Sequence, residues 1–289
     1  MNKKITIVLI SYKSGEKLKK FVGNIPSSVP VYIIDNSKDF NLKKIFKKRK
    51  NIKVFFKKNE GYGSSINYAA NKIKTPYFLA VQPDVKNINS KALYQFLKYA
   101  IITKNNFSVI GPHFLNASKK GHYQTNIKNK IQKIHNVHGS TMFFNKKVFL
   151  KNKGFDKNIF LYWEETDYTK RCLQNGYSAY QLNTVKVIHE KGKAVDTRNN
   201  EDVEKLKNLY IWHFIWSKFY FYNKHYGPII SFVYFIPVFV RILFRLLIYV
   251  KINPSKYKKY LCRYDGLKKS FLRKKSLMRL EMIKKINFF

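Results

Sequence analysis

Short apolar runs alternate with amphipathic segments along the first 110 residues or so of the chain. Short apolar runs bounded by polar residues predict buried strands, and the segments between them have the spacing of helices. Strands alternating with helices predict βαβ units and an α/β fold with a central, mostly parallel sheet flanked by helices. The expected strands are 5–12, 31–35, 51–56, 76–82 and 107–111, and the expected helices are 15–24, 40–48, 64–73 and about 90–103.

The pattern becomes irregular after residue 111. Residues 112–136 are polar, and we interpret them as a loop over an active site, because loops often carry binding residues. The strand-like segment 137–145 follows, and after it come a short helix, a Gly-Phe-Asp turn and a helix over about 164–175.

The composition shifts near residue 196, from a mixed sequence to an aromatic and basic one. We therefore divide the chain into a catalytic domain, 1–195, and a C-terminal helical region, 196–289. The apolar segment 228–250 is long enough to cross a bilayer, for which roughly 20 residues suffice.

Pro237 interrupts this apolar segment, and Arg241 and Arg245 lie four residues apart on one helical face. Arginine is costly near the middle of a bilayer but is accommodated among lipid headgroups by a helix that lies in the membrane plane. We expect an in-plane or re-entrant segment; a full span and a buried helix of a soluble core are the alternatives.

The formal net charge is +41. Such a charge attracts nucleic acid, anionic lipid and phosphorylated ligands alike, and AT-rich codon usage would also produce a chain rich in Lys, Asn, Ile, Phe and Tyr. The tail 251–289 holds thirteen Lys and Arg residues against two acids. Each basic residue near an anionic membrane adds roughly 1 kcal/mol of attraction. We expect the C-terminal region to bind an anionic membrane surface.

The two cysteines, Cys172 and Cys262, lie far apart without the spacing of metal ligands, which suits a reducing compartment. A strand-like run starts at Ile5, and we find no pattern of a signal peptide. These features predict a protein at the cytoplasmic face of the cell membrane, peripheral or re-entrant.

Polar residues follow the predicted strands at their carboxyl ends, where ligands bind in open α/β sheets. An Asp after a strand is by itself more typical of a turn or a helix cap. Polar groups at three successive strand ends, however, converge on one crevice and indicate a binding site. They are Asp35 and Asn36 after the second strand, Asn59, Gly61, Gly63 and Asn67 after the third, and Asp84 after the fourth.

These residues belong to motifs that resemble glycosyltransferase family 2, in the branch that includes bacterial rhamnosyltransferases. The motifs occur in the family's order over about residues 5–227. They are Ile10-Ser11-Tyr12-Lys13-Ser14, Ile34-Asp35-Asn36-Ser37, Asn59-Glu60-Gly61-Tyr62-Gly63-Ser64-Ser65-Ile66-Asn67, Gln82-Pro83-Asp84, Gly154-Phe155-Asp156-Lys157 through Tyr162-Trp163-Glu164-Glu165-Thr166-Asp167, His189-Glu190-Lys191-Gly192, and the aromatic and basic segment Ser217 to Gly227.

The resemblance implies a GT-A fold, a nucleotide-sandwich domain with an acceptor half, and it implies roles for the motif residues. Asp84 would hold Mg²⁺ or Mn²⁺, which prefer oxygen ligands, and His189 would lie near the metal or the diphosphate; a purely structural histidine is the alternative. Donor binding would fall to Ser11, Tyr12 (near the base), Asp35 (to the base or ribose), Asn36, Asn59, Gly61, Gly63, Asn67 and Asp84, and the acceptor side to Trp163 and Asp167.

Glu164, Glu165 and Asp167 form an acidic cluster at the start of a predicted helix. Glu164 and Asp167, three residues apart, share a face of this helix. Acids in the first turn stabilise the helix dipole by roughly 0.3–1 kcal/mol each, which is the structural alternative. The resemblance instead aligns Glu165 with the family's catalytic Asp, the general base that deprotonates the acceptor hydroxyl, and Glu164 could share this task.

The chain departs from the family pattern at two places. Glu165 is one methylene longer than the usual Asp, and Gln82 replaces an Asn, so that Asp84 is a single acid where many relatives have Asp-x-Asp. The resemblance implies an inverting glycosyltransferase that moves a sugar, with rhamnose from dTDP-rhamnose as the first expectation and a UDP-hexose as the alternative, to a lipid-linked glycan or polysaccharide. A catalytically inactive relative and, from another class, a basic nucleic-acid-binding protein are the rival interpretations; no nucleic-acid-binding motif is present, and we expect no nucleic-acid partner.

Overall fold

The structure is a computed structural model that describes residues 4–117, 129–190, 192, 194–195, 200–279, 282–283 and 286. The chain divides into two compact units. The first unit, here the catalytic unit, comprises Met1–Asp156 and Glu164–Asp196; the second, the helical unit, comprises Lys157–Trp163 and Thr197–Phe289. The expected division placed 157–163 in the catalytic domain.

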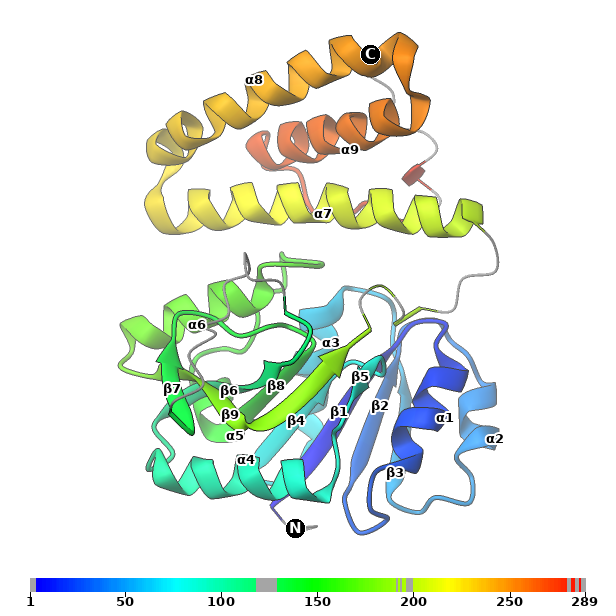
Figure 1. Cartoon of the computed structure of the whole chain (residues 1–289), viewed down its shortest axis with the longest axis vertical. Helices are drawn as coiled ribbons and strands as arrows, with labels where there is room; N and C mark the ends of the chain where they lie inside the picture. The colour runs from blue at the N-terminus through cyan, green and yellow to red at the C-terminus, as the bar shows by residue number, and fades with distance from the viewer. Residues whose placement is uncertain are drawn as a thin grey trace. The chain divides into compact units, whose positions relative to one another are not determined.

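One half of the sheet in the catalytic unit is parallel (Figure 1). The chain forms the central strand, adds two strands on one side and then returns to the other side of the central strand. The strand order therefore reverses next to the central strand, and such a switch point is where open α/β sheets bind ligands. In spatial order these strands are β3 (Ile52–Phe56), β2 (Val31–Asp35), β1 (Ile5–Ser11) and β4 (Tyr77–Val81).

The other half of the sheet is mixed. The strand beside β4 is antiparallel to it, and the last three positions are joined through one long strand, Ser178–His189. The predicted loop 112–136 contains the end of one strand and the whole of another. The strands are β8 (Thr141–Asn145), β6 (Phe107–Phe114), β9 (Ser178–His189) and β5 (Val85–Lys86), with β7 (Ile131–Ile134) also paired to β9.

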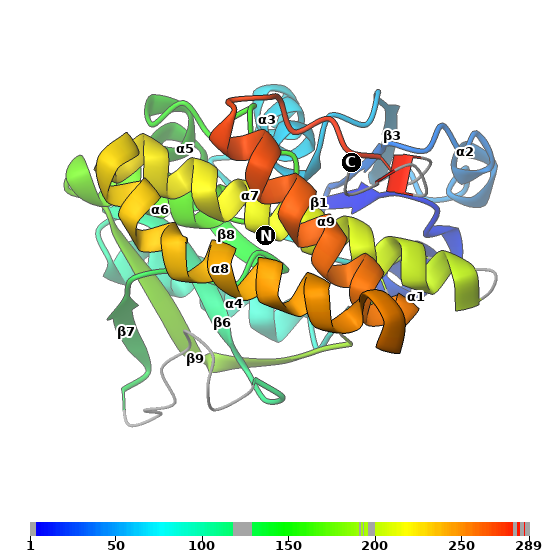
Figure 2. The ribbon, with the colours of Figure 1, turned by 90° about the horizontal axis from the view of Figure 1, so that it is seen from above.

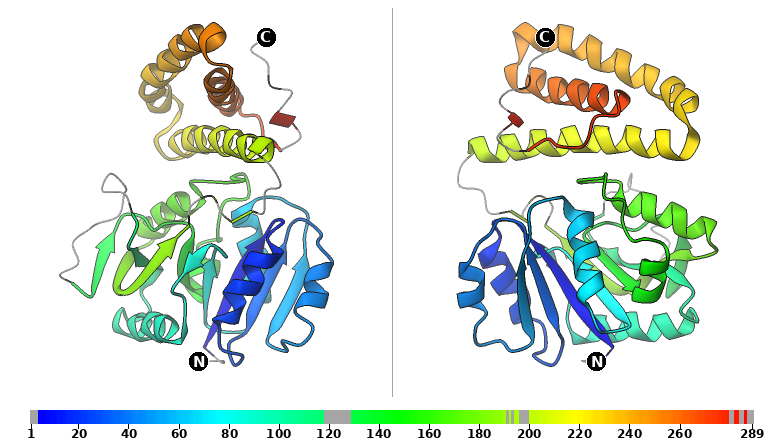
Figure 3. Two further views of the ribbon diagram at one scale, coloured as in Figure 1. Left: turned by 45° about the vertical axis from the view of Figure 1, so that its right-hand side comes forward. Right: turned by 180° about the vertical axis from the view of Figure 1, so that it is seen from behind.

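Helices cover both faces of this sheet, as Figure 3 shows from two sides. Alternate strand residues point to opposite faces, and apolar side chains on both faces are buried, such as Ile7 and Val8 of β1. One face packs on α1 (Gly15–Gly23), α2 (Asn41–Ile45) and α4 (Ser90–Ile102). The opposite face carries α3 (Tyr62–Lys72), α5 (Lys146–Lys151) and α6 (Glu164–Gln174). The predicted α/β class with a helix-flanked sheet is confirmed.

An aromatic cluster holds α5 and α6 to the sheet. The Phe78 and Phe144 rings, from adjacent strands, stack at 4.9 Å, and Phe149 and Tyr168 pack edge-on against Phe144 at 5.0 and 5.6 Å. All four side chains are fully or almost fully buried. Truncating one such ring to Ala typically costs about 3–5 kcal/mol. The cluster therefore holds α5 and α6 firmly against the sheet.

The helical unit contains three long helices packed on one another (Figure 2). They are α7 (Asn200–Tyr226), α8 (Pro228–Ile252) and α9 (Pro254–Phe271). Gly227, with φ +85°, makes the turn between α7 and α8, and Pro228 occupies the first turn of α8, where a missing N–H costs nothing. The Asn253 side chain caps α9 by accepting a hydrogen bond from the Lys256 amide at 2.9 Å.

Candidate active site

Two residues from distant parts of the sequence meet beyond the end of β4. Asp84 immediately precedes β5, and the pairing of β5 with β9 sets Val85 opposite His189. The Glu190 amide also donates a hydrogen bond to the Asp84 carbonyl at 3.0 Å. As a result, Asp84 Oδ2 and His189 Nε2 are 3.4 Å apart, and both residues are buried.

Three side-chain atoms of this pair are left without hydrogen bonds by the described residues. Within the described part of the chain, neither carboxylate oxygen of Asp84 nor Nδ1 of His189 has a hydrogen-bond partner. A buried carboxylate without a partner is costly, and a bound cation would remove that cost. Oxygen and imidazole donors suit Mg²⁺ and Mn²⁺, so the residues present fit such an ion.

The pair does not by itself complete a coordination shell. Among the described residues no group of three His, Cys, Asp or Glu side chains could hold a metal. Mg²⁺ characteristically keeps several waters and takes substrate phosphates as further ligands. We therefore expect an ion to bind here together with a phosphate-bearing ligand rather than alone.

A cavity of about 440 Å³ borders Asp84. Three lysines line it, Lys17, Lys20 and Lys86, of which Lys86 pairs with Glu190 at 2.8 Å. Lysine ammonium groups are frequent phosphate partners. The surroundings of Asp84 thus suit an anionic ligand.

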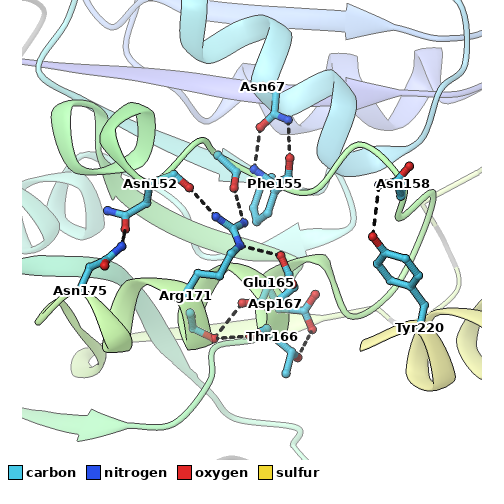
Figure 4. Close-up of polar contacts among 12 residues, drawn as sticks. Asn67, Asn152, Phe155, Asn158, Glu165, Thr166, Asp167, Arg171, Asn175 and Tyr220 are labelled. Carbon is cyan, nitrogen blue, oxygen red and sulfur yellow. Dashed lines mark hydrogen bonds and ion pairs between the residues drawn. The ribbon is translucent and has the colours of Figure 1, made fainter. Parts of the chain in front are cut away.

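Glu164 and Glu165 open α6 and have different environments. Glu164 is buried at 3% exposure, and its Oε2 has no hydrogen-bond partner in the described residues. Glu165 is half-buried and accepts a hydrogen bond from the Thr166 hydroxyl at 3.4 Å (Figure 4). Thr166 in turn receives one from Asn136 at 2.7 Å.

These environments separate the protonation of the two carboxyl groups. Burial raises the pKa of Glu164 well above its ordinary value, and the neighbouring charge of Glu165 raises it further. Burial also raises the pKa of Glu165, but hydrogen bonds from Asn136 and Thr166 favour its charged form. The local environment therefore favours the neutral form more strongly at Glu164 than at Glu165.

Tyr62 is a buried residue whose pKa responds to the nearby acidic side chains. Its hydroxyl donates a hydrogen bond to the Gly139 carbonyl at 2.9 Å. Burial raises the pKa of Tyr62 well above the ordinary value, and the charges of Glu164, Glu165 and Asp84 add to this effect. A Cβ on Gly139 would lie 3.7 Å from Glu165 Oε2, so the 138–140 turn runs directly beside the Glu165 carboxylate.

His138 and Ser140 also border this site, although the sequence motifs did not indicate them. The His138 ring lies 4.9 Å from that of His189, and His138 Nδ1 accepts a hydrogen bond from the Ser140 amide at 3.1 Å. This bond leaves Nε2 of His138 as the protonated nitrogen. The polar residues around Gly139, immediately before the apolar strand β8, could have indicated a turn. The interpretation of 137–145 as one strand included them in the strand instead.

Asp167 is engaged inside the fold. Its carboxylate is fully buried and accepts a hydrogen bond from Arg171 Nε at 2.8 Å. The same guanidinium donates to the carbonyl of Asn152, as Figure 4 shows, and to that of Gly154. Asp167 and Glu164 are both buried, in accord with their expected common face, and Asp167 anchors the turn that precedes α6. Its predicted role on the acceptor side stays a prediction.

Asn67 and Gly63 contact this same turn. The Asn67 side chain accepts from the Phe155 amide at 2.9 Å and donates to the Phe155 carbonyl at 2.8 Å (Figure 4). A Cβ on Gly63 would lie 2.9 Å from the Phe155 Cβ, and one on Gly154, which has φ +57°, only 2.4 Å from the Asn67 amide oxygen. Both glycines are therefore required for close approach of α3 to the turn.

The predicted nucleoside contacts lie at the ends of β1 and β2. The Asp35 carboxylate, fully buried, accepts hydrogen bonds from the Ser37 hydroxyl and the Asp39 amide, each at 2.8 Å. Asn36 donates to Ser65 at 2.9 Å, which ties β2 to α3. Asp35 thus orders the turn after β2, and its contact with a base or ribose stays a prediction.

The remaining predicted donor residues surround the same strand ends. Ser11 is buried, with its hydroxyl 3.1 Å from that of Ser14, and Tyr12 is half-buried. Asn59 accepts a hydrogen bond from the amide of Gly61 at 3.3 Å. Gly61 has φ +104°, so its backbone conformation disfavours a side chain at the start of α3.

Trp163, predicted on the acceptor side, belongs to the helical unit. Its ring lies 5.1 Å from Phe221 and 6.1 Å from Phe214 of α7. Tyr162 and Trp163 both have positive φ angles, 65° and 70°. Such angles cost of order 1–3 kcal/mol for a non-glycine residue and persist only where packing imposes them, and here the packing is provided by α7.

Comparisons with known proteins give both homology and fold. No protein-family model matches the chain. Over 209 residues, 65% of this chain and 67% of the other, it is 22% identical to the low-salt glycan biosynthesis hexosyltransferase Agl10 of Haloferax volcanii. Its structure resembles the mannosyltransferase PcManGT from Pyrobaculum calidifontis in complex with GDP-Man and Mn²⁺, with a TM-score of 0.57, 9% identity and coverage of 94% of this chain and 88% of that one. It also resembles TarS 1–349 from S. aureus in complex with UDP-GlcNAc, with a TM-score of 0.53, 15% identity and coverage of 93% and 81%.

The fold is that of GT-A glycosyltransferases. Together with the sequence homology, it supports a glycosyltransferase, and the predicted fold and enzyme class are confirmed. The rhamnosyltransferase branch, the donor, the acceptor, the metal and the membrane remain predictions.

Proposed function

We propose that the chain transfers a hexose from a nucleoside-diphosphate sugar to an acceptor hydroxyl, with inversion and in a single displacement. The observation that carries this proposal is the pair Glu164 and Glu165 beside Tyr62, in a catalytic unit that also buries Asp84, whose carboxylate oxygens have no hydrogen-bond partner among the described residues. A general base and a site for the departing diphosphate are the two groups that such a displacement requires.

In this proposal Glu165 takes the proton from the acceptor hydroxyl as its oxygen attacks the anomeric carbon. Glu164 remains protonated and, by staying neutral, avoids repelling the charge on Glu165. Thr166 and Asn136 orient the base through hydrogen bonds. A divalent ion held by Asp84 and His189 would supply charge neutralisation to the leaving diphosphate.

Rhamnose from dTDP-rhamnose remains the first candidate donor, because the motifs resemble the rhamnosyltransferase branch. Two of the structurally similar proteins bind other donors, GDP-Man and UDP-GlcNAc, and the homologous hexosyltransferase is compatible with either kind of donor. A UDP- or GDP-linked hexose is therefore the alternative within the same chemistry, and both use the same base.

We propose that the helical unit lies in the plane of an anionic membrane and that the acceptor is lipid-linked. Among the described residues α8 alone is long and apolar enough to cross a bilayer, yet little of it is buried. Its few buried residues, from Ser231 to Leu246, pack it onto α7 and α9 along its length. A spanning α8 would carry the basic residues of α9 into the hydrocarbon, which is costly. An in-plane arrangement immerses only the apolar face of α8.

Glu165→Gln tests this function. The substitution keeps the size and removes the base, so we expect transfer to fall by about 10²–10⁴-fold while the Kd for the nucleotide sugar stays within about twofold. Transfer is measured as release of nucleoside diphosphate in the presence of acceptor, and binding by calorimetry.

Glu164→Gln is the matched comparison, since it replaces a protonated carboxyl with a neutral amide of similar shape. We expect it to retain far more activity than Glu165→Gln. Near-normal turnover by Glu165→Gln would remove Glu165 from the reaction, and the reverse order of the two variants would assign the base to Glu164. A wild-type protein that binds nucleotide sugars without any turnover would identify an inactive relative.

A further inference from the structure

The helical unit contains an apolar groove between α8 and α9, with a volume of about 330 Å³. Ten residues line it, four of them from α8, and every one except Lys268 is apolar or aromatic. It lies outside the catalytic unit, and none of the predicted site residues lines it. We refer to it as the α8–α9 groove.

The groove forms because two apolar stripes face each other without filling the space between them. On α8 the stripe runs from Phe232 to Phe239 at the spacing of one helix face. The Phe232 ring lies 6.0 Å from that of Phe271, and the Phe239 ring lies 6.1 Å from that of Tyr264. These two ring pairs come from opposite ends of the groove lining.

The groove has a buried floor and an exposed rim. Phe235 and Leu267 are 3% and 4% exposed, whereas Phe232 and Phe271 are each 52% exposed. Large exposed apolar side chains around a concavity are characteristic of a binding site rather than of ordinary surface. An engineered apolar cavity of about 150 Å³ already binds benzene, so this groove can hold a considerably longer hydrocarbon.

A single cation marks one end of the groove lining. The Lys268 ammonium lies 5.7 Å from the centre of the Tyr264 ring and is exposed. An apolar channel with a cation at its border is complementary to an amphiphile with one hydrocarbon chain and an anionic head.

We propose that the α8–α9 groove binds the hydrocarbon chain of the lipid-linked acceptor, with the acceptor's phosphate at Lys268. This inference rests on the proposed function, because it names the chemistry of the acceptor: a single chain bearing a phosphate. Bulk membrane phospholipid and a second copy of the protein are the alternative occupants.

Binding of farnesyl phosphate to the full-length protein tests the proposal. The probe has one isoprenoid chain and one phosphate. Its affinity is measured by calorimetry below its micellar concentration, with farnesol and inorganic phosphate as the two halves of the ligand. We expect farnesyl phosphate to bind at least tenfold more tightly than farnesol and inorganic phosphate to show no binding. Equal affinity for vesicles of phosphatidylglycerol and for farnesyl phosphate at matched lipid would assign the groove to bulk lipid and overturn the proposal.

Two matched pairs of variants locate the site. Ile236 lines the groove, whereas Ile229 is exposed on the same helix and does not line it. We expect Ile236→Gln to weaken farnesyl phosphate binding about tenfold, through lost apolar burial, and Ile229→Gln to leave it unchanged. Lys268→Gln should weaken farnesyl phosphate about tenfold without affecting farnesol, and Lys259→Gln on the same helix should do neither.

Equal effects of the two substitutions of either pair on farnesyl phosphate binding would overturn the proposal. The proposal would also be overturned if light scattering showed that the protein forms dimers and that the dimer no longer binds farnesyl phosphate. A failure of the proposed function can be distinguished from a failure of the groove proposal, because binding is measured without a transfer assay. If farnesyl phosphate binds as described and no sugar is transferred, the enzyme assignment fails alone. If transfer to a soluble acceptor proceeds and farnesyl phosphate does not bind, the groove proposal fails alone.

Discussion

Two buried aspartates of the catalytic unit differ in what surrounds them. Asp167 is bonded to Arg171, whose guanidinium also binds two backbone carbonyls. Asp84 is equally buried, but neither of its oxygens has a hydrogen-bond partner among the described residues, and its near neighbour is His189. A buried carboxylate that is saturated stabilises the fold, and one that is left open is available to a ligand. Asp167 therefore has a structural role beside the site, whereas Asp84 is available to bind a ligand in it.

The largest expected effect falls on the saturated aspartate. Asp167→Asn leaves Arg171 without its charged partner in the interior, and breaking a buried pair in this way typically costs about 3–5 kcal/mol. We expect the free energy of unfolding, measured by chemical denaturation, to fall by that amount. A loss below about 1 kcal/mol would show that the Arg171 network does not anchor the turn before α6.

A slightly smaller effect, of a different kind, is expected for the open aspartate. Asp84→Asn should leave the free energy of unfolding unchanged or raise it, because it removes a buried charge whose carboxylate oxygens have no hydrogen-bond partner among the described residues. It should lower sugar transfer by about 10²–10³-fold, the usual cost of losing one electrostatic partner of the transition state.

Asp202→Asn serves as the control for this activity loss, since Asp202 lies on α7 of the helical unit and not in the catalytic unit. If Asp84→Asn destabilised the protein as much as Asp167→Asn, the distinction between the two aspartates would be lost.

The smallest expected effect concerns the pH dependence of stability through Glu164. Burial raises the folded-state pKa of Glu164 above its unfolded value, so the folded state binds more protons, and stability falls as pH rises through the interval between the two pKa values. The amide in Glu164→Gln cannot ionise, so this variant should lose the part of the stability decrease with rising pH that Glu164 causes. The difference in unfolding free energy between the variant and the wild type should therefore shift in favour of the variant by about 1 kcal/mol or more between pH 4 and pH 8.

Thermal or chemical unfolding of both proteins across this pH range measures the effect. Parallel stability curves for the two proteins would show that Glu164 does not retain its proton, and the assignment of the base to Glu165 would lose its electrostatic support.

Much of the fold follows from local patterns, whereas the site depends on contacts between distant segments. The apolar runs around Ile7, Ile33 and Leu79 predicted the parallel half of the sheet, because strands buried on both faces are continuously apolar. The long strand β9 was not predicted, since Gln181, Asn183 and Lys186 interrupt its apolar positions.

The candidate site shows the same division. Sequence motifs placed Asp84, Glu165 and His189 among the functional candidates, but their spacing could not bring them together. The meeting of Asp84 with His189 depends on the pairing of β5 with β9, and the turn at His138 is placed beside them by long-range packing. Likewise, only the structure reveals that Asn67 bonds the backbone of Phe155.

The α8 helix illustrates how packing overrides a local signal. Pro237 interrupts the apolar segment in sequence, yet α8 is continuous from Pro228 to Ile252. A proline removes one backbone hydrogen bond, and the contacts of α8 with α7 and α9 compensate. The apolar pattern predicted a membrane-directed segment but not the groove that α8 forms with α9.

The central claim is that Asp84 and His189 hold a divalent ion together with the diphosphate of a sugar donor. Thermal unfolding of the wild type and of Asp84→Asn, with Mn²⁺ and with GDP-, UDP- and dTDP-linked sugars, separately and combined, tests it most directly. A ligand present at 100 times its Kd stabilises the folded state by about 2.7 kcal/mol. We predict that one class of nucleotide sugar stabilises the wild type strongly only when Mn²⁺ is also present, and that Asp84→Asn loses this joint effect. Stabilisation by the same sugar without metal, or equally in Asp84→Asn, would contradict the claim.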